Sequence, residues 1–243
     1  MSLSDKRWDD TWYVGKKPAW PEYTNLRIEW FIEECKDLKK KRELEKPVIV
    51  EIGAGTGWVT KELCKFFPES PYYCTDISMF ALKQIEDLNL ANVKTIHISE
   101  LVKMGHIADI IICGDVIEHV EDRMTFFETI TDIIKPDRYL LLTTPNRYLP
   151  NLFLNRLLGK EATSQPYDRP FSQKELEDVI SNYNFEIIKS FHMKAEGYQP
   201  IKYRSILRKI VHKVLLSLLT SFLNIKNFNT HDSIMLRAKY KPS

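Results

Sequence analysis

The sequence predicts an α/β protein built on a doubly wound, mainly parallel sheet. After Pro47, short apolar runs alternate with amphipathic segments, several of these runs are apolar on both faces, and glycines gather behind the first run. Strands that are apolar on both faces are typical of a sheet covered by helices on both sides. Right-handed crossovers between such strands give a doubly wound sheet.

The individual elements follow from apolar periodicity and from the residues that bound it. A helix-like segment at 25–44 precedes the core. The core strands are expected at 48–52, 72–77, 93–99, 108–114 and 139–145, and the helices between them at 58–67, 78–88 and 120–134. Further along, a capping box of Ser172 and Glu175 opens a helix at 172–183, and two more strands are expected at 185–193 and 231–241.

The 243 residues predict one domain with additions. We expect an N-terminal lid and helix segment at 1–46, a core at 47–146, and the remainder of the same domain at 147–243. That remainder contains an irregular insert at 147–171 and an amphipathic helix at about 203–223.

Composition excludes some classes of protein. A net charge of +2, with 28% charged residues, argues against nucleic-acid binding driven by global charge. The four cysteines show no CxxC spacing, which favours buried free thiols in a reducing compartment. The N-terminal residues have no apolar region of signal-peptide type, and the apolar stretch at 214–225 is too short to span a bilayer. We therefore expect a cytoplasmic protein.

The stretch "IVEIGAGTGWVT" places Gly53, Gly55 and Gly57 between a strand and a helix. Ligands of open α/β sheets bind at such carboxyl ends, and glycine allows a ligand to approach the backbone closely. The dinucleotide fingerprint fails because Trp58 stands where its third glycine belongs, and no Walker-type lysine follows. Glu51 would repel a pyrophosphate but would suit a ligand with an ammonium or sulfonium charge.

With "YYCTDIS", "ADIIICGDVIEHV" and "IIKPDRYLLLTTPN" following in order, residues 47–146 resemble the class I S-adenosylmethionine-dependent methyltransferases. The resemblance implies a Rossmann-like seven-stranded sheet with an antiparallel last strand. It also implies S-adenosyl-L-methionine as the methyl donor and S-adenosyl-L-homocysteine as the product. The implied cofactor-binding residues are Glu51, Gly53, Ala54, Gly55, Gly57, Asp76, Ile77, Ser99, Glu100 and Asp115.

Among these residues, Asp76 would accept hydrogen bonds from the ribose hydroxyls, and Ser99 or Glu100 would lie near the adenine amine. One departure from the family concerns the turn before the fifth strand. Asp137 and Arg138 follow Pro136 there in place of the usual glycine pair, and we expect Pro136 and Asp137 to start a type I turn.

His119, assisted by Glu118, is the leading candidate for a catalytic base, because a neutral imidazole suits proton removal from a hydroxyl. A helix-capping role for His119 is the structural alternative. A third interpretation comes from Asp115, Glu118 and His119, which resemble the metal-binding E-x-x-E-H motif of small-RNA 2′-O-methyltransferases. The segment "QPYDRPFSQKEL" lacks the further histidine of that family, so these three are weak metal candidates.

The acceptor site of the family lies outside the common core. Candidate substrate contacts are Trp12, Tyr13, Arg147, Tyr148, Tyr167 and Arg169. Packing of the N-terminal rings and a plain surface loop are the alternatives. The basic amphipathic helix at 203–223 fits peripheral contact with a membrane, and it fits core packing or a homodimer interface at least as well.

We therefore predict a methyltransferase of the ubiquinone-type or methyltransferase-11-like group. The predicted reaction is O-methylation of a small-molecule or lipid-linked acceptor, such as a quinone, polyprenyl compound or glycan. The alternatives are a divalent-metal-assisted RNA 2′-O-methyltransferase, with nucleic acid disfavoured as a partner, and a non-catalytic cofactor-binding regulatory module.

Overall fold

The computed structural model describes residues 21–40, 44–146, 169–196 and 230–242. These residues build one seven-stranded sheet with the order β3-β2-β1-β4-β5-β7-β6. The strands are β1 (Ile49–Ile52), β2 (Tyr72–Thr75), β3 (Val93–Thr95), β4 (Ala108–Gly114), β5 (Ile134–Pro145), β6 (Phe185–Glu196) and β7 (Thr230–Tyr240). Strands β1 to β5 pair in parallel, and β7 is antiparallel to both of its neighbours. The predicted doubly wound sheet with an antiparallel last strand is confirmed.

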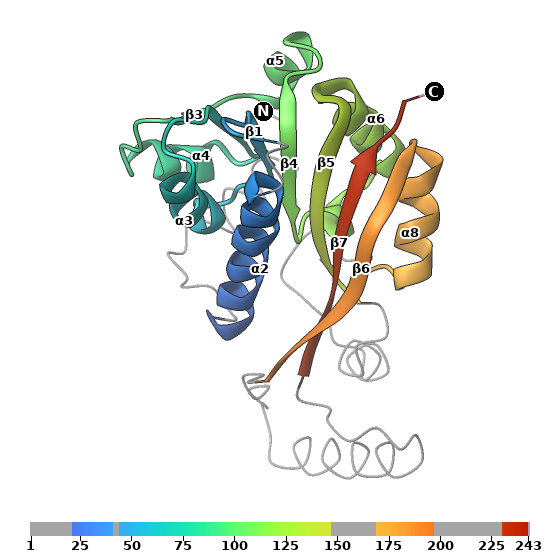
Figure 1. The fold of residues 1–243 in the computed structure, drawn as a ribbon. Helices are drawn as coiled ribbons and strands as arrows, with labels where there is room; N and C mark the ends of the chain where they lie inside the picture. The colour runs from blue at the N-terminus through green and yellow to red at the C-terminus, as the bar shows by residue number, and fades with distance from the viewer. Residues whose placement is uncertain (1–20, 41–43, 147–168, 197–229, 243) are drawn as a thin grey trace.

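Helices cover both faces of the sheet, as the apolar strands predicted. One face carries α2 (Pro21–Lys40), α3 (Trp58–Phe66) and α4 (Met79–Glu86), and the other carries α5 (Ile98–Lys103), α6 (Arg123–Ile133) and α8 (Gln173–Asn182). Successive residues of a strand alternate between the faces, so Ile49 packs in the first core and Val50 in the second. Figure 1 shows α2 lying over the sheet beside β1 and β4, roughly along the direction of the strands, with α8 next to β6.

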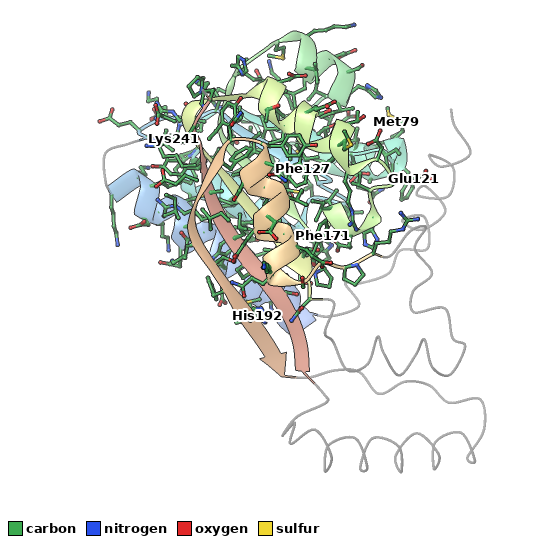
Figure 2. All side chains as sticks on the ribbon, turned by 90° about the vertical axis from the view of Figure 1, so that its right-hand side faces the viewer. Met79, Glu121, Phe127, Phe171, His192 and Lys241 are labelled. Atoms are coloured by element: carbon green, nitrogen blue, oxygen red, sulfur yellow. The ribbon has the colours of Figure 1, made fainter. Side chains whose placement is uncertain are left out.

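The long antiparallel pair of β6 and β7 extends past the carboxyl ends of the parallel strands. Pro145 at the end of β5 pairs with Ser233, whereas β6 and β7 remain paired as far as Glu196 and Thr230. Figure 1 shows this extension at the lower edge of the sheet, where β4 and β5 also end. Figure 2, turned toward α8, shows Phe127 and Phe171 against this helix and His192 near its lower end.

Two local expectations were wrong. The strand expected at 93–99 ends at Thr95, because the His97 side chain accepts a hydrogen bond from the Ser99 N–H and starts α5. The turn before the main part of β5 is not type I, because Asp137 has a φ of +60°. Asp137 therefore adopts the left-handed conformation for which glycine is usually used.

Burial explains the cysteines. Cys35, Cys64, Cys74 and Cys113 are all free and buried, as predicted. Burial raises the pKa of the Cys35 thiol to about 12, so this group stays protonated and packs as a small apolar side chain. Of the helices in the described ranges, none combines the length and the apolar character needed to cross a bilayer.

A buried ion-pair network fixes α2 to the sheet. Arg237 of β7 donates through Nη1 to Glu34 at 3.0 Å and to Asp37 at 2.8 Å, and Lys189 of β6 donates to Glu34 at 2.6 Å. Both Glu34 and Arg237 are only 4% exposed. Removing one partner of a buried pair leaves the other charge uncompensated, so the network holds α2 in one position.

Glu34→Ala should lower the free energy of unfolding by about 3 kcal/mol, the lower end of the range for a broken buried pair, because Asp37 stays on Arg237. Denaturant titration measures this loss. Glu33→Ala is the matched control: Glu33 is the neighbouring residue, its pair with Lys36 is exposed, and the expected change is below about 0.5 kcal/mol. Equal losses in the two variants would contradict the role given to the network.

Candidate active site

The glycine turn after β1 has no room for side chains at its first position. Gly53, Gly55 and Gly57 have φ values of +70°, +53° and +82°, which favour glycine. A Cβ atom on Gly53 would lie 2.2 Å from Val116 Cγ2. The turn therefore presents bare backbone at the carboxyl end of β1, as the sequence predicted.

Asp76 ties the glycine turn to the end of β2. Its Oδ2 accepts a hydrogen bond from the Gly55 N–H at 2.8 Å, and its Oδ1 accepts one from the Ser78 N–H at 2.9 Å. The next residue, Ile77, is 50% exposed. A nucleoside could therefore bind here with its ribose at the Asp76 carboxylate and its flat base against the Ile77 side chain.

Ser99 and Glu100 lie in the first turn of α5 and are exposed. The Ser99 hydroxyl lies 2.8 Å from His97 Nδ1. Their assignment to the adenine amine remains a prediction.

Glu51 points into the face covered by α2 and α3. Its Oε2 accepts hydrogen bonds from the Thr60 hydroxyl at 2.7 Å and from the Tyr72 hydroxyl at 2.6 Å. Desolvation by burial raises the pKa of Glu51 to about 7, and the two hydroxyls and the Arg27 charge oppose this rise. Near neutral pH a nearby positive charge would favour the carboxylate form of Glu51.

Asp115, directly after β4, joins three elements. Its Oδ2 accepts from Arg27 Nη1 at 2.5 Å and its Oδ1 from the Thr143 hydroxyl at 2.9 Å. It has a φ of +56°, a conformation that non-glycine residues rarely adopt. Sequence reasoning missed Arg27, which belongs to no motif. The structure places it at the carboxyl end of β4, where a Cβ on Gly114 would lie 3.7 Å from its Cδ.

Glu118 and His119 lie side by side in the 3₁₀ turn η1 (Ile117–His119). Glu118 is 1% exposed, and its Oε2 accepts from the Thr144 hydroxyl at 2.9 Å. His119 Nε2 lies 3.6 Å from Glu118 Oε1, and the His119 side chain is 12% exposed. The predicted pair is thus brought together, and Thr144, whose role the sequence did not indicate, fixes its acidic member.

One predicted acceptor contact can be placed. The backbone N–H of Arg169 donates to the Glu118 carbonyl at 2.9 Å, so this end of the 147–171 insert lies against η1. Trp12, Tyr13, Arg147, Tyr148 and Tyr167 lie outside the described residues, as does the helix at 203–223.

Within the described part of the chain, no group of three or more His, Cys, Asp or Glu residues is placed to hold a metal ion. The two carboxylates among the three weak candidates have other partners: Arg27 and Thr143 bind Asp115, and Thr144 binds Glu118.

Comparison with known proteins identifies the family. A family model described as "Methyltransferase domain" matches residues 27–190. The chain belongs to this family, and it is an S-adenosylmethionine-dependent methyltransferase of the class I fold.

Two relatives are similar in sequence to this chain. The ubiquinone biosynthesis O-methyltransferase of Rickettsia typhi is 27% identical over 179 residues, 67% of this chain and 69% of that protein. The malonyl-acyl-carrier-protein O-methyltransferase of Neorickettsia risticii is 27% identical over 130 residues, 53% of this chain and 50% of that protein.

Of the solved structures, magnesium protoporphyrin IX methyltransferase from Synechocystis PCC 6803, with bound S-adenosylhomocysteine, has a TM-score of 0.57 at 15% identity. The matched region covers 92% of this chain and 84% of the chain of that methyltransferase. A SAM-dependent methyltransferase from Aquifex aeolicus has a TM-score of 0.56 at 13% identity. The matched region covers 95% of this chain and 97% of that chain. These likenesses support the fold.

Gly53→Ala should destabilise the protein by about 1–3 kcal/mol more than Gly105→Ala, because the new Cβ collides with Val116. Gly105 is a matched control, since its φ is also +70° and a Cβ there meets nothing within 4 Å. Thermal or denaturant unfolding measures the difference. Val116→Ala should restore most of the stability of Gly53→Ala, and failure of this rescue would argue against the collision.

Glu51 should make the protein less stable as pH rises. Because the folded pKa of about 7 lies above the ordinary 4.5, the folded state holds the proton longer than the unfolded state does. The free energy of unfolding should therefore fall, by up to about 3 kcal/mol, as pH rises through this window. Glu51→Gln should flatten this fall in denaturant titrations at pH 5 to 8, whereas Glu62→Gln, on the same side of the sheet, should keep it. A parental slope in Glu51→Gln would contradict the assignment.

Proposed function

We propose that this methyltransferase O-methylates a small-molecule or lipid-linked acceptor with the help of His119. The observation that carries the proposal is the alignment of three features along one edge of the sheet. Asp76 follows β2, the glycine turn follows β1, and both Asp115 and His119 follow β4. A donor held by the first two would present its reactive end at the third.

The residues present fit S-adenosylmethionine. The glycine turn offers backbone N–H groups, Asp76 would bind the ribose hydroxyls, and Ile77 would contact the adenine. The guanidinium of Arg27, at the end of β4, suits a carboxylate at the other end of the ligand. Glu51, in β1 just before the glycine turn, would favour the positively charged end of the ligand. When bound, this cofactor supplies a methyl group on a sulfonium sulfur.

His119 would hold the acceptor and take its proton. The Glu118 carboxylate, 3.6 Å from His119 Nε2, would favour one orientation of the imidazole. Placing the acceptor oxygen in line with the methyl group would supply much of the catalysis. Thr144, through Glu118, would act on the orientation of His119 without touching the acceptor.

The acceptor class is supported by the two relatives, which are both O-methyltransferases by name. One acts in ubiquinone biosynthesis and the other on a malonyl-acyl-carrier protein. Alkylated catechols and malonylated carrier protein are therefore the first acceptors to test with a labelled methyl donor. Transfer to either would support the proposal. Transfer to RNA alone, lost on chelation, would favour the metal-assisted alternative, and binding of the donor without any transfer would favour a regulatory module.

Asp76→Ala should weaken S-adenosylhomocysteine binding at least tenfold, because it removes a carboxylate from the ribose hydroxyls. Calorimetric titration measures this affinity. His119→Ala should slow turnover by about 10²–10⁴-fold and leave that affinity nearly unchanged. An unchanged affinity in Asp76→Ala, or a large loss of affinity in His119→Ala, would refute the respective role.

A further inference from the structure

Two buried polar side chains beside the proposed site have no hydrogen-bond partner among the residues that the structure describes: Trp30 at its indole Nε1 and Ser233 at its hydroxyl. Ser233 is completely buried, and Trp30 is 9% exposed. An unsatisfied buried donor costs about 1–3 kcal/mol, so such groups are uncommon unless something else binds them.

Both groups lie on the side of the sheet that α2 covers. On β7, Met235 packs in the core beneath α2 and Arg237 pairs with Glu34 of that helix. Alternate residues of a strand share a face, so Ser233 also faces α2. Its sheet neighbours are Pro145 of β5 and Met193 of β6.

Trp30 reaches the same part of this face from α2. Its ring centroid lies 5.0 Å from that of Phe31 and 6.4 Å from that of Phe191 on β6. Phe191 pairs with Met235, two residues before Met193 along β6. A helical side chain leans toward the N-terminus of its helix, and in α2 this is the direction of Arg27 and the carboxyl ends of the strands. The indole thus approaches the level of Ser233.

The strand order continues the line of the proposed cofactor site. The donor-binding residues follow β2, β1 and β4, and the next strands in the sheet are β5 and then β7, where Ser233 stands. A donor that presents its methyl group at the end of β4 would have its acceptor on the side of β5 and β7. We infer that Trp30 and Ser233 form a subsite that binds an oxygen atom of the methyl acceptor, an inference that rests on the proposed function.

The chemistry of the subsite defines the kind of acceptor. The indole N–H only donates, whereas the serine hydroxyl both donates and accepts. The ring neighbours of Trp30 are Phe31 and Phe191, and the sheet neighbours of Ser233 are Pro145 and Met193. Two neutral donors beside apolar neighbours suit an uncharged oxygen on an aromatic or alkyl body, such as the second hydroxyl of an alkylated catechol.

The test is calorimetric titration of 4-butylcatechol into the full chain saturated with S-adenosylhomocysteine. Ser233→Ala and Trp30→Phe should each weaken catechol binding about tenfold, the value of one hydrogen bond, and leave the affinity for S-adenosylhomocysteine within about twofold. Ser190→Ala is the matched control on β6, since its hydroxyl already bonds Gln173 of α8. It should bind the catechol as the parent does.

The inference is overturned if Ser233→Ala binds the catechol with parental affinity, and a raised melting temperature of this variant would then show that the hydroxyl is only an unfavourable burial. Absence of catechol binding to the parent would overturn it as well. Ser233→Ala loses no appreciable volume, so the test stands even where Trp30→Phe fails to fold. Failure of methyl transfer with unchanged catechol-binding results would count against the proposed function alone.

Discussion

The position of Asp115 is the constraint on which the rest of the site depends. This residue follows the central strand β4 in a left-handed conformation that is costly for any side chain. Arg27 from α2 and Thr143 from β5 both bind its carboxylate, so that three separate elements meet at one residue. Because these contacts compensate the backbone strain, the chain can turn sharply after β4 and place Val116 against Gly53.

Two successive threonines at the end of β5 each bind a carboxylate of the candidate site, one on each face of the sheet. Thr143 and Thr144 point to opposite faces because side chains alternate along a strand. Thr143 binds Asp115 on the face of α2, and Thr144 binds Glu118 on the other. One strand end therefore orients both the cofactor side and the proposed base, and neither carboxylate depends on a flexible loop for its partner.

Helix α2 contributes to the candidate site through its position as much as through its own groups. The buried pair of Glu34 and Arg237 fixes it against β7, and Arg27 then reaches the end of β4. Buried pairs add little net stability but strongly penalise displacement, since either charge alone would be uncompensated. This suits a helix that must hold Arg27 and Trp30 at set places on one face.

The sequence by itself determined the sheet, the helices on both faces and the residues of the glycine turn, because apolar periodicity and glycine spacing are local signals. It also determined that Asp76 and His119 lie at strand ends. It missed α5, because the His97 cap was not recognised within an apolar run, and it assigned a wrong turn to Asp137.

Only the tertiary structure decided which groups meet. Arg27 is 88 residues from Asp115 along the chain, and Arg237 is 203 from Glu34. Such pairs leave no periodic pattern in the sequence, because the partners lie on different elements. They come together only when α2 packs on the sheet. The same reason applies to Trp30 and Ser233. Neither has a hydrogen-bond partner in the described part of the chain, and this follows from the packing of the core, where burial removes water and an unpaired polar group costs free energy.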